Sequence, residues 1–146
     1  MSEPVPPSPF SDFYFLALDH AFGSIEDGGG PLVPFTMSIG SDGKKGLTRF
    51  VAERLEEGLE QAKASVTATA ALAMYAIAWD GYVTLDGRKW DAVFVEAGEA
   101  SQEFGLMLCQ RYVIPKKGLF RKSRNESVGN PTLVGKPPSR IWTGHA

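Results

Sequence analysis

The sequence is poor in the residues that build covalent, metal and nucleophilic sites. Its one cysteine, Cys109, excludes a disulfide within the chain and a zinc site made of cysteine thiolates. The two histidines, His20 and His145, lie near opposite ends of the sequence, and neither stands beside Cys109. We therefore expect Cys109 to be a small buried hydrophobic residue instead of a nucleophile, and we predict no metal and no other cofactor.

Long apolar runs and export signals are also missing. No stretch approaches the roughly 18 uncharged apolar residues of a membrane-spanning helix. The sequence starts Met-Ser-Glu-Pro, which lacks the basic start and apolar core of a signal peptide. These absences predict a cytoplasmic protein without a membrane partner.

Familiar catalytic motifs are absent as well. There is no Gly-x-Ser-x-Gly turn and no His-Glu-x-x-His pair. Glu96 is followed by Ala97 and Gly98, so the Glu-x-Lys pattern of a nuclease core is not present. Asp91 and Glu96 also have opposite parity on one predicted strand, and their side chains would point to opposite faces. These patterns weigh against an enzyme without excluding one.

What the sequence does contain is enough apolar material for one folded domain. It has 146 residues, of which 43% are hydrophobic and 22% are charged, and this balance is typical of a globular chain. The 16 glycines and 10 prolines lie mainly between the apolar runs and act as turn signals. We predict a flexible N-terminus over residues 1–9, a single α+β domain over 10–114 and a basic C-terminal tail over 115–146.

Charge is distributed unevenly between that domain and its tail. Up to Val113 the chain has 16 acidic and 8 basic residues, whereas from Ile114 onward it has 1 acidic and 7 basic residues. Such a tail could neutralise nucleic-acid phosphates, or it could dock on the acidic domain or on a second subunit. We favour docking, because the net charge of −2 argues against general affinity for nucleic acid. The candidate binding residues of the tail are Lys116, Lys117, Arg121, Lys122 and Arg124.

Two helices are predicted from apolar spacing. Aromatic and alanine residues between Phe10 and Phe22 recur at helical intervals, and a second apolar stripe extends over residues 46–66. A glycine-rich loop with Lys44 and Lys45 precedes the second stripe. If a helix begins there, its free N–H groups and the two lysines could bind an anion such as phosphate, although the glycines are equally explained by a turn.

The most informative stretch is 72–114, which reads as three consecutive antiparallel strands. Asp86-Gly87 is a preferred two-residue hairpin turn, because both central residues need positive φ. That turn fixes a register in which Tyr82 opposes Asp91 and Trp79 opposes Phe94. One face then carries the tryptophans and the other carries mostly small residues. A further strand over 32–39 contains Pro34, which predicts an edge position.

The third strand has no such turn to fix its register. Matching residues by size puts Leu106, Leu108 and Tyr112 on the tryptophan face, and places Arg111 with Asp80 and Asp91 on the other. Two carboxylates beside an arginine could serve as acid and base or bind a cation through oxygen atoms. They could equally form an internal ion pair. Asp80, Asp91 and Arg111 are therefore weak catalytic candidates.

Both faces of this sheet are apolar, so each must be covered. The second helix can cover one face; the N-terminal helix, the tail or a second subunit must cover the other. This argument predicts a homo-oligomer that forms on part of the sheet or at its edge, and it leaves room for a different protein partner.

Taken together, the sequence predicts an α+β fold with an antiparallel three- to four-stranded meander sheet. One long amphipathic helix and a shorter N-terminal helix are expected to pack on it. The expected function is a non-catalytic binding or interaction module that self-associates. Two alternatives stay open: a small enzyme using Asp80, Asp91 and Arg111, and a nucleic-acid accessory protein using the basic tail.

Overall fold

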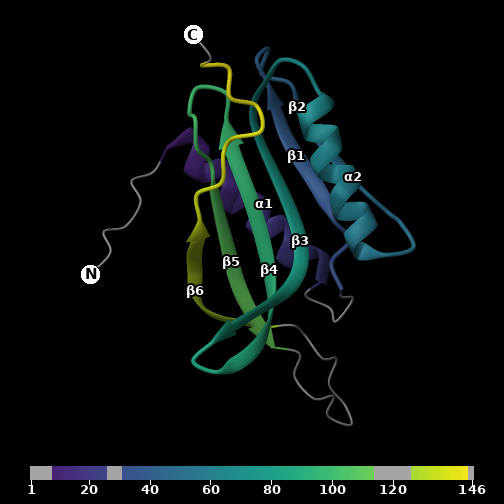
Figure 1. Ribbon diagram of the computed structural model, residues 1–146, viewed down its shortest axis with the longest axis vertical. Helices are drawn as coiled ribbons and strands as arrows, with labels where there is room; N and C mark the ends of the chain where they lie inside the picture. The colour runs from purple at the N-terminus through teal and green to yellow at the C-terminus, as the bar shows by residue number, and fades with distance from the viewer. Residues whose placement is uncertain (1–7, 26–30, 114–125, 145–146) are drawn as a thin grey trace.

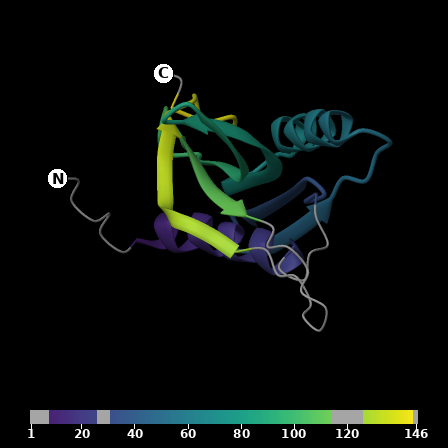
Figure 2. The ribbon, with the colours of Figure 1, turned by 90° about the horizontal axis from the view of Figure 1, so that it is seen from below.

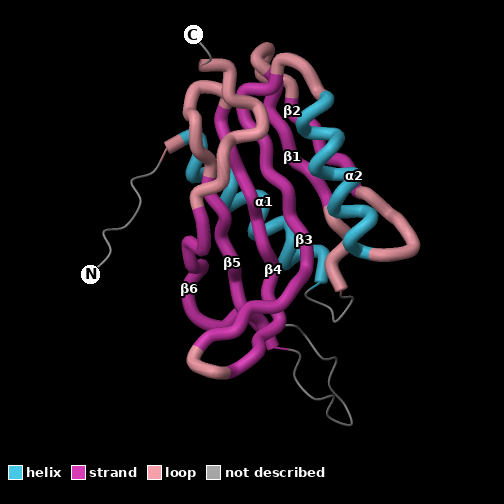
Figure 3. Tube along the Cα trace, in the orientation of Figure 1, coloured by secondary structure: helices cyan, strands magenta, loops and turns pink. Residues whose placement is uncertain are grey.

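The computed structural model describes residues 8–25, 31–113 and 126–144. Within them the chain forms two helices and six strands (Figures 1 and 3). Their bounds are α1 Pro9–Ile25, β1 Phe35–Gly40, β2 Lys45–Arg49, α2 Leu55–Ala68, β3 Leu72–Leu85, β4 Arg88–Glu99, β5 Leu106–Val113 and β6 Glu126–Gly135. The predicted N-terminal segment 1–9 lies almost entirely outside the described residues.

All six strands form one antiparallel sheet in the order β2-β1-β3-β4-β5-β6. The helix α1 lies behind this sheet in Figure 1, whereas α2 and the C-terminal segment lie in front, and Figure 2 shows the same layers from below. The predicted α+β class with an antiparallel sheet is confirmed. The three- to four-stranded meander is wrong, and so is the order of helix lengths, because α1 has 17 residues and α2 has 14.

One unpredicted strand comes from the beginning of the expected long helix. Residues 45–49 form β2, in which Leu47 lies opposite Met37 of β1. The tight loop before β2 contains Gly43 at φ +85°, and the Lys44 backbone N–H donates to Asp42 Oδ1 over 2.9 Å. The short connection makes pairing with β1 possible, and α2 begins only at Leu55.

The position of β1 also differs from the prediction. Pro34 comes before the strand instead of within it, and its carbonyl accepts a hydrogen bond from the Phe50 backbone N–H over 2.9 Å. A proline just outside a strand removes no ladder hydrogen bond. As a result β1 pairs on both sides and is an internal strand.

The sixth strand, β6, was not predicted, because it contains Gly129 and Pro131, which are uncommon within strands. These residues coincide with a register irregularity against β5, where the pairing shifts between Cys109 and Arg111.

After β6, residues 136–143 fold back over the sheet, as the yellow segment of Figure 1 shows. The Gly105 N–H donates to the Pro137 carbonyl over 2.7 Å, and the Thr143 N–H donates to the Ala100 carbonyl over 3.0 Å.

The register of the β3–β4 hairpin is confirmed. Tyr82 lies opposite Asp91 and Trp79 lies opposite Phe94, as the Asp-Gly turn requires. The turn residues Asp86 and Gly87 have φ values of 52° and 75°. A primed turn matches the twist of the flanking strands, so it carries the register along the whole hairpin.

The register predicted for the third strand is wrong by one residue. Asp91 lies opposite Tyr112 and Ala92 opposite Arg111, so Leu108 and Tyr112 join the small-residue face. The reason lies in volume: that face has alanines on β3, and larger side chains from β5 and α1 fill the space above them. Arg111 therefore lies on the tryptophan face, opposite to the prediction.

Each face of the sheet has its own core. On the α1 face, Ala76, Ala78, Val93 and Val95 pack with Tyr112, Leu108 and the buried side of α1. On the α2 face, Tyr75 and Ile77 pack with Ala62 and Val66 of α2, and Ile141 adds to them from the C-terminal segment. Both faces are thus covered by the chain itself over these regions. Self-association stays a prediction. No helix in the described part of the chain is long and apolar enough to cross a membrane.

Candidate functional site

Asp80 joins three separate segments at one end of the α1 face. Its Oδ2 atom accepts a hydrogen bond from the Leu32 backbone N–H over 2.8 Å. The Tyr112 hydroxyl lies 2.9 Å from Oδ1 and 3.0 Å from Oδ2. Burial raises the pKa of Asp80, and the charge of Asp91 adds to the rise, whereas the hydrogen bonds from Leu32 and Tyr112 oppose it. Both oxygens are used to hold the segment before β1 and strand β5 against β3.

A pocket of about 310 Å³ opens beside this carboxylate. Its lining residues are Pro31, Leu55, Asp80, Gly81, Tyr82, Asp91 and Tyr112. The structure therefore brings Asp80 and Asp91 to one pocket, as the hairpin register predicts. Among the described residues no group of three histidine, cysteine or acidic side chains could hold a metal ion. The pocket has carboxylates and phenols but lacks a cation to complete the predicted cluster.

Arg111, the third member of that cluster, lies on the other face of the sheet. Its guanidinium carbon is 4.8 Å from the centroid of the Trp90 ring. Because adjacent residues on a strand point to opposite faces, Arg111 and Tyr112 cannot both reach Asp80. The register of β5 places Tyr112 on the same face as Asp80 and Arg111 on the opposite face. The predicted Asp80/Asp91/Arg111 cluster therefore does not form.

Lys44 and Lys45 do not precede a helix. They lie in the β1–β2 loop and at the start of β2, and the hollow that they line also contains Ala70 and Ala71, which follow the C-terminus of α2. A helix C-terminus attracts cations instead of anions. The physical basis predicted for an anion site at these lysines is therefore absent.

The candidate residues of the basic tail, 116–124, lie outside the described residues. The part that follows β6 contains a buried cluster that sequence reasoning missed. Glu96 is only 2% exposed; its Oε2 accepts from Arg140 Nε over 2.6 Å and from the Tyr75 hydroxyl over 2.8 Å. Arg140 Nη2 donates to Glu96 Oε1 over 3.1 Å. An acidic residue within an apolar strand was the available signal that a basic partner is required.

The most open part of the sheet is the edge formed by β2. All five of its residues are exposed, and no further strand of the described chain pairs with it. Hydrogen bonds from Gly40 N–H to the Lys44 carbonyl and from Phe50 N–H to the Pro34 carbonyl show which pairs bond to β1. Because such pairs alternate in an antiparallel ladder, Lys45, Leu47 and Arg49 direct their backbone groups outward.

The start of β2, at Lys45 and Gly46, lines one side of an apolar groove. Since Leu47 lies opposite Met37 on the α1 face, the side chains of β2 at odd positions stand beside α1. A groove of about 210 Å³ lies between them, with Phe13, Leu16, Met37 and Ile39 among its walls. Leu16 in the groove wall is 54% exposed, and Leu47, opposite the lining residue Met37, is 41% exposed, so this side of the sheet edge presents apolar surface to solvent.

Comparisons of the chain with protein-family models, with curated proteins and with solved structures found no match.

Proposed function

We propose that the protein is a non-catalytic interaction module that binds an extended segment of a partner protein along β2. The observation that supports this function most strongly is the coincidence of outward backbone groups and an apolar groove on one five-residue strand. An extended segment that adds to a sheet edge gains main-chain hydrogen bonds, and its alternate side chains enter neighbouring pockets. At β2 those side chains would lie between Leu16 and Leu47.

Charge favours an acidic partner over a second copy of this chain. Lys45 and Arg49 flank Leu47 on the same face of the strand. In the longest symmetric pairing of two β2 strands, Lys45 of each copy would lie opposite Arg49 of the other, and like charges in that position destabilise a sheet. Acidic residues in those positions would instead form two ion pairs. Self-association, which the sequence predicted, is therefore the competing outcome of the test.

The opposite edge of the sheet is less suited to the same role. Strand β6 contains Pro131, which lacks a backbone donor, and its pairing with β5 is irregular. Prolines and irregularities of this kind protect an edge from further pairing. This contrast supports β2 as the edge at which a partner strand adds.

The test uses a synthetic acetylated peptide, Thr-Glu-Thr-Val-Thr-Glu-Thr, whose valine lies opposite Leu47 in an antiparallel pairing. Titration followed by isothermal calorimetry should show saturable binding that weakens as salt is added. Hydrogen exchange should slow at Lys45, Leu47 and Arg49, whose N–H groups point outward, and stay unchanged at Gly46 and Thr48, which already bond to β1.

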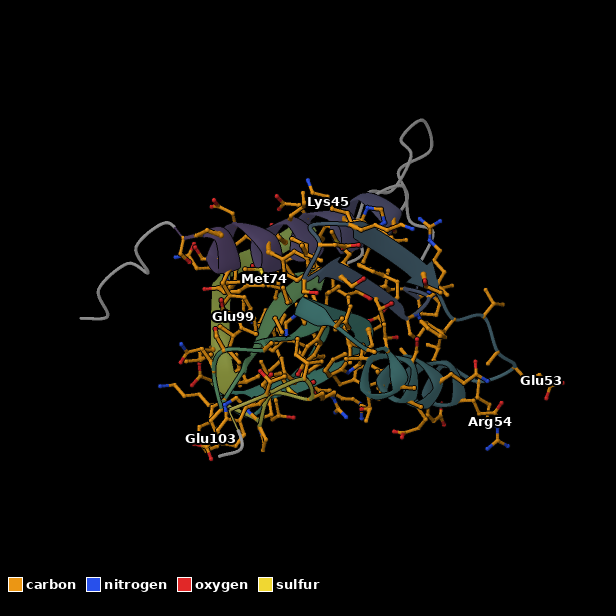
Figure 4. All side chains as sticks on the ribbon, turned by 90° about the horizontal axis from the view of Figure 1, so that it is seen from above. Lys45, Glu53, Arg54, Met74, Glu99 and Glu103 are labelled. Atoms are coloured by element: carbon orange, nitrogen blue, oxygen red, sulfur yellow. The ribbon has the colours of Figure 1, made fainter. Side chains whose placement is uncertain are left out.

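Two control peptides and a pair of protein variants separate backbone pairing from charge attraction. A peptide with lysine in place of both glutamates, and one with N-methylated valine, should each bind at least about tenfold more weakly, because an ion pair and a hydrogen bond to β2 are lost. The variant Arg49→Glu should weaken binding, whereas Arg54→Glu should not. Figure 4 shows Lys45 beside α1 and Arg54 well away from it, before the start of α2. Equal binding of all three peptides, or a concentration-dependent dimer without peptide, would contradict the proposal.

The enzyme alternative is less well supported by the arrangement around Asp80. Both carboxylate oxygens already accept hydrogen bonds from the protein, and a carboxylate held in this way tethers segments more readily than it transfers protons. The nucleic-acid alternative through the tail residues 116–124 stays a prediction.

A further inference from the structure

A second surface, distant from β2, has properties that neither core explains. It lies on the α2 face of the sheet near the β3–β4 turn, and we call it the arginine–aromatic surface, formed by Trp79, Phe94, Trp90, Arg88 and Arg111. Trp90 and Phe94 are half-buried and belong to neither hydrophobic core. In Figure 1, α2 and the C-terminal segment lie in front of the upper part of the sheet, and among the described residues no helix lies in front of the lower part of β3 and β4.

Two aromatic rings of this surface stack on one another, and one of them, Trp79, also packs against the edge of the α2 core. Trp79 and Phe94 are a directly opposed cross-strand pair, with ring centroids 5.6 Å apart and ring planes inclined by 10°. The Phe94 ring also lies over Gly81, where an added Cβ would come within 3.0 Å of it. A side chain at Gly81 would displace this ring, so the glycine permits a flat aromatic layer on the strands.

Two arginines flank the third ring. The guanidinium carbon of Arg88 is 3.8 Å from the centroid of the Trp90 ring, and that of Arg111 is 4.8 Å from it. Neither arginine forms an ion pair with a carboxylate among the described residues. Stacking on an indole orients a guanidinium plane but does not use its N–H edge, so both arginines keep donors for an anion.

We propose that the arginine–aromatic surface binds single-stranded nucleic acid. Single strands are bound by combining stacking on aromatic side chains with cationic contacts to phosphates, and both elements are present here on neighbouring strands. An acidic peptide would satisfy the arginines but would not use the aromatic layer. The surface is an open sheet face, which suits an extended strand with exposed bases. This site is independent of the β2 edge and uses none of its residues.

The test measures tryptophan fluorescence of the full chain on titration with a 12-nucleotide deoxythymidine strand at low salt. Stacked bases should quench the emission, and the logarithm of the affinity should fall with the logarithm of salt by about 0.7 per phosphate contact. The double variant Arg88→Gln/Arg111→Gln should bind at least about tenfold more weakly and show a shallower salt dependence. Phe94→Leu should weaken binding at least about fivefold, because a stacking surface is lost.

Matched variants and a second probe decide between this site and general charge attraction. Arg49→Gln, on the β2 edge, should bind the deoxythymidine strand with the same affinity as the unchanged protein. Inorganic polyphosphate, which has phosphates but no bases, should bind more weakly and leave the fluorescence unchanged. Thermal melting of each variant checks that it is folded. If the double variant does not fold, the single variant Arg88→Gln, which changes an exposed side chain, replaces it in the binding test.

Three results would overturn the proposal. The first is an absence of binding at low salt. The second is binding that persists in the double variant but disappears when the five basic residues at 116, 117, 121, 122 and 124 are changed to glutamine. The third is equal affinity for polyphosphate and the deoxythymidine strand.

Discussion

Arg140 should contribute far more to stability than its position near the C-terminus suggests. It is the cationic partner of Glu96, which is 2% exposed and accepts hydrogen bonds from Arg140 and the Tyr75 hydroxyl. Changing Arg140 to alanine leaves that carboxylate buried without its counter-charge. Removing one partner of a buried ion pair costs about 3–5 kcal/mol, since the desolvation penalty of the other is no longer offset.

The geometry places the expected loss near the lower end of that range. The Arg140 side chain is 29% exposed, so water can reach its position when the guanidinium is removed and can solvate Glu96 in part. We expect Arg140→Ala to reduce the free energy of unfolding by about 3 kcal/mol, which corresponds to a fall in melting temperature of roughly 10 °C. Urea unfolding followed by circular dichroism measures the free energy directly, provided that the m-value is unchanged.

Two further variants test the cause of the loss. Glu96→Gln combined with Arg140→Ala should be more stable than Arg140→Ala alone, because the unpaired buried charge is then removed. Lys136→Ala, at an exposed side chain of the same segment, should change stability by less than about 0.5 kcal/mol. A loss below about 1 kcal/mol for Arg140→Ala, or no relief from the glutamine, would refute the argument.

Three other predictions follow from single residues. Burial raises the pKa of Asp80 above 3.8, so its stabilising contribution is complete below that pH and is lost as the pH rises through the raised value. Urea unfolding should show that Asp80→Asn gains stability relative to the unchanged protein as the pH rises from 3.8 through that value. Gly105→Ala should lower the free energy of unfolding by about 1–3 kcal/mol, because its Cβ would meet the Ala97 carbonyl, whereas Gly23→Ala, in open space on a helix, should raise it by up to about 1 kcal/mol. Gly87→Ala should cost about 1 kcal/mol at φ +75°, measured in the same way.

The parts of the fold that the sequence predicts well are those with local determinants. The register of β3 and β4 depends on Asp86-Gly87 alone, and every pair along the hairpin follows from that turn. The approximate position of α1 follows from its aromatic spacing, although the helix continues past Gly23 to Ile25. Its N-terminus is set by Ser8, whose hydroxyl accepts from the Ser11 N–H over 3.0 Å.

The parts that fail depend on contacts between distant segments. The register of β5 is set by the volume that α1 and β5 must fill above the alanines of β3, and no short loop fixes it. Leu47 falls at helical spacing with the apolar residues that follow it, yet pairing of residues 45–49 with β1 overrides that local preference. The partner of Glu96 is 44 residues away, and only the folded C-terminal segment identifies it.

This dependence on distant contacts also explains why the predicted site was only half assembled. The hairpin register predicts correctly that Asp80 and Asp91 lie together. The predicted register of β5 was off by one residue, so it put Arg111 beside them where the structure has Tyr112. The difference matters for the chemistry of the pocket, because the Tyr112 phenol donates a hydrogen bond without adding the positive charge of an arginine. The observed register also places the Arg111 guanidinium on the other face, where it lies with Arg88 beside Trp90.

The charges of β2 admit two explanations, and Leu47 helps to choose between them. Basic residues on an edge strand commonly prevent sheets from joining, and Lys45 and Arg49 would have that effect on a second copy of this chain. Protection alone, however, gives no reason for an exposed leucine between the two charges, opposite Met37, which lines a groove together with the exposed Leu16. Replacing Leu47 by threonine keeps the strand propensity and both charges. If the edge is only protected, this change should be neutral in every assay; if it binds a partner strand, peptide affinity should fall at least about fivefold while stability changes by less than about 0.5 kcal/mol.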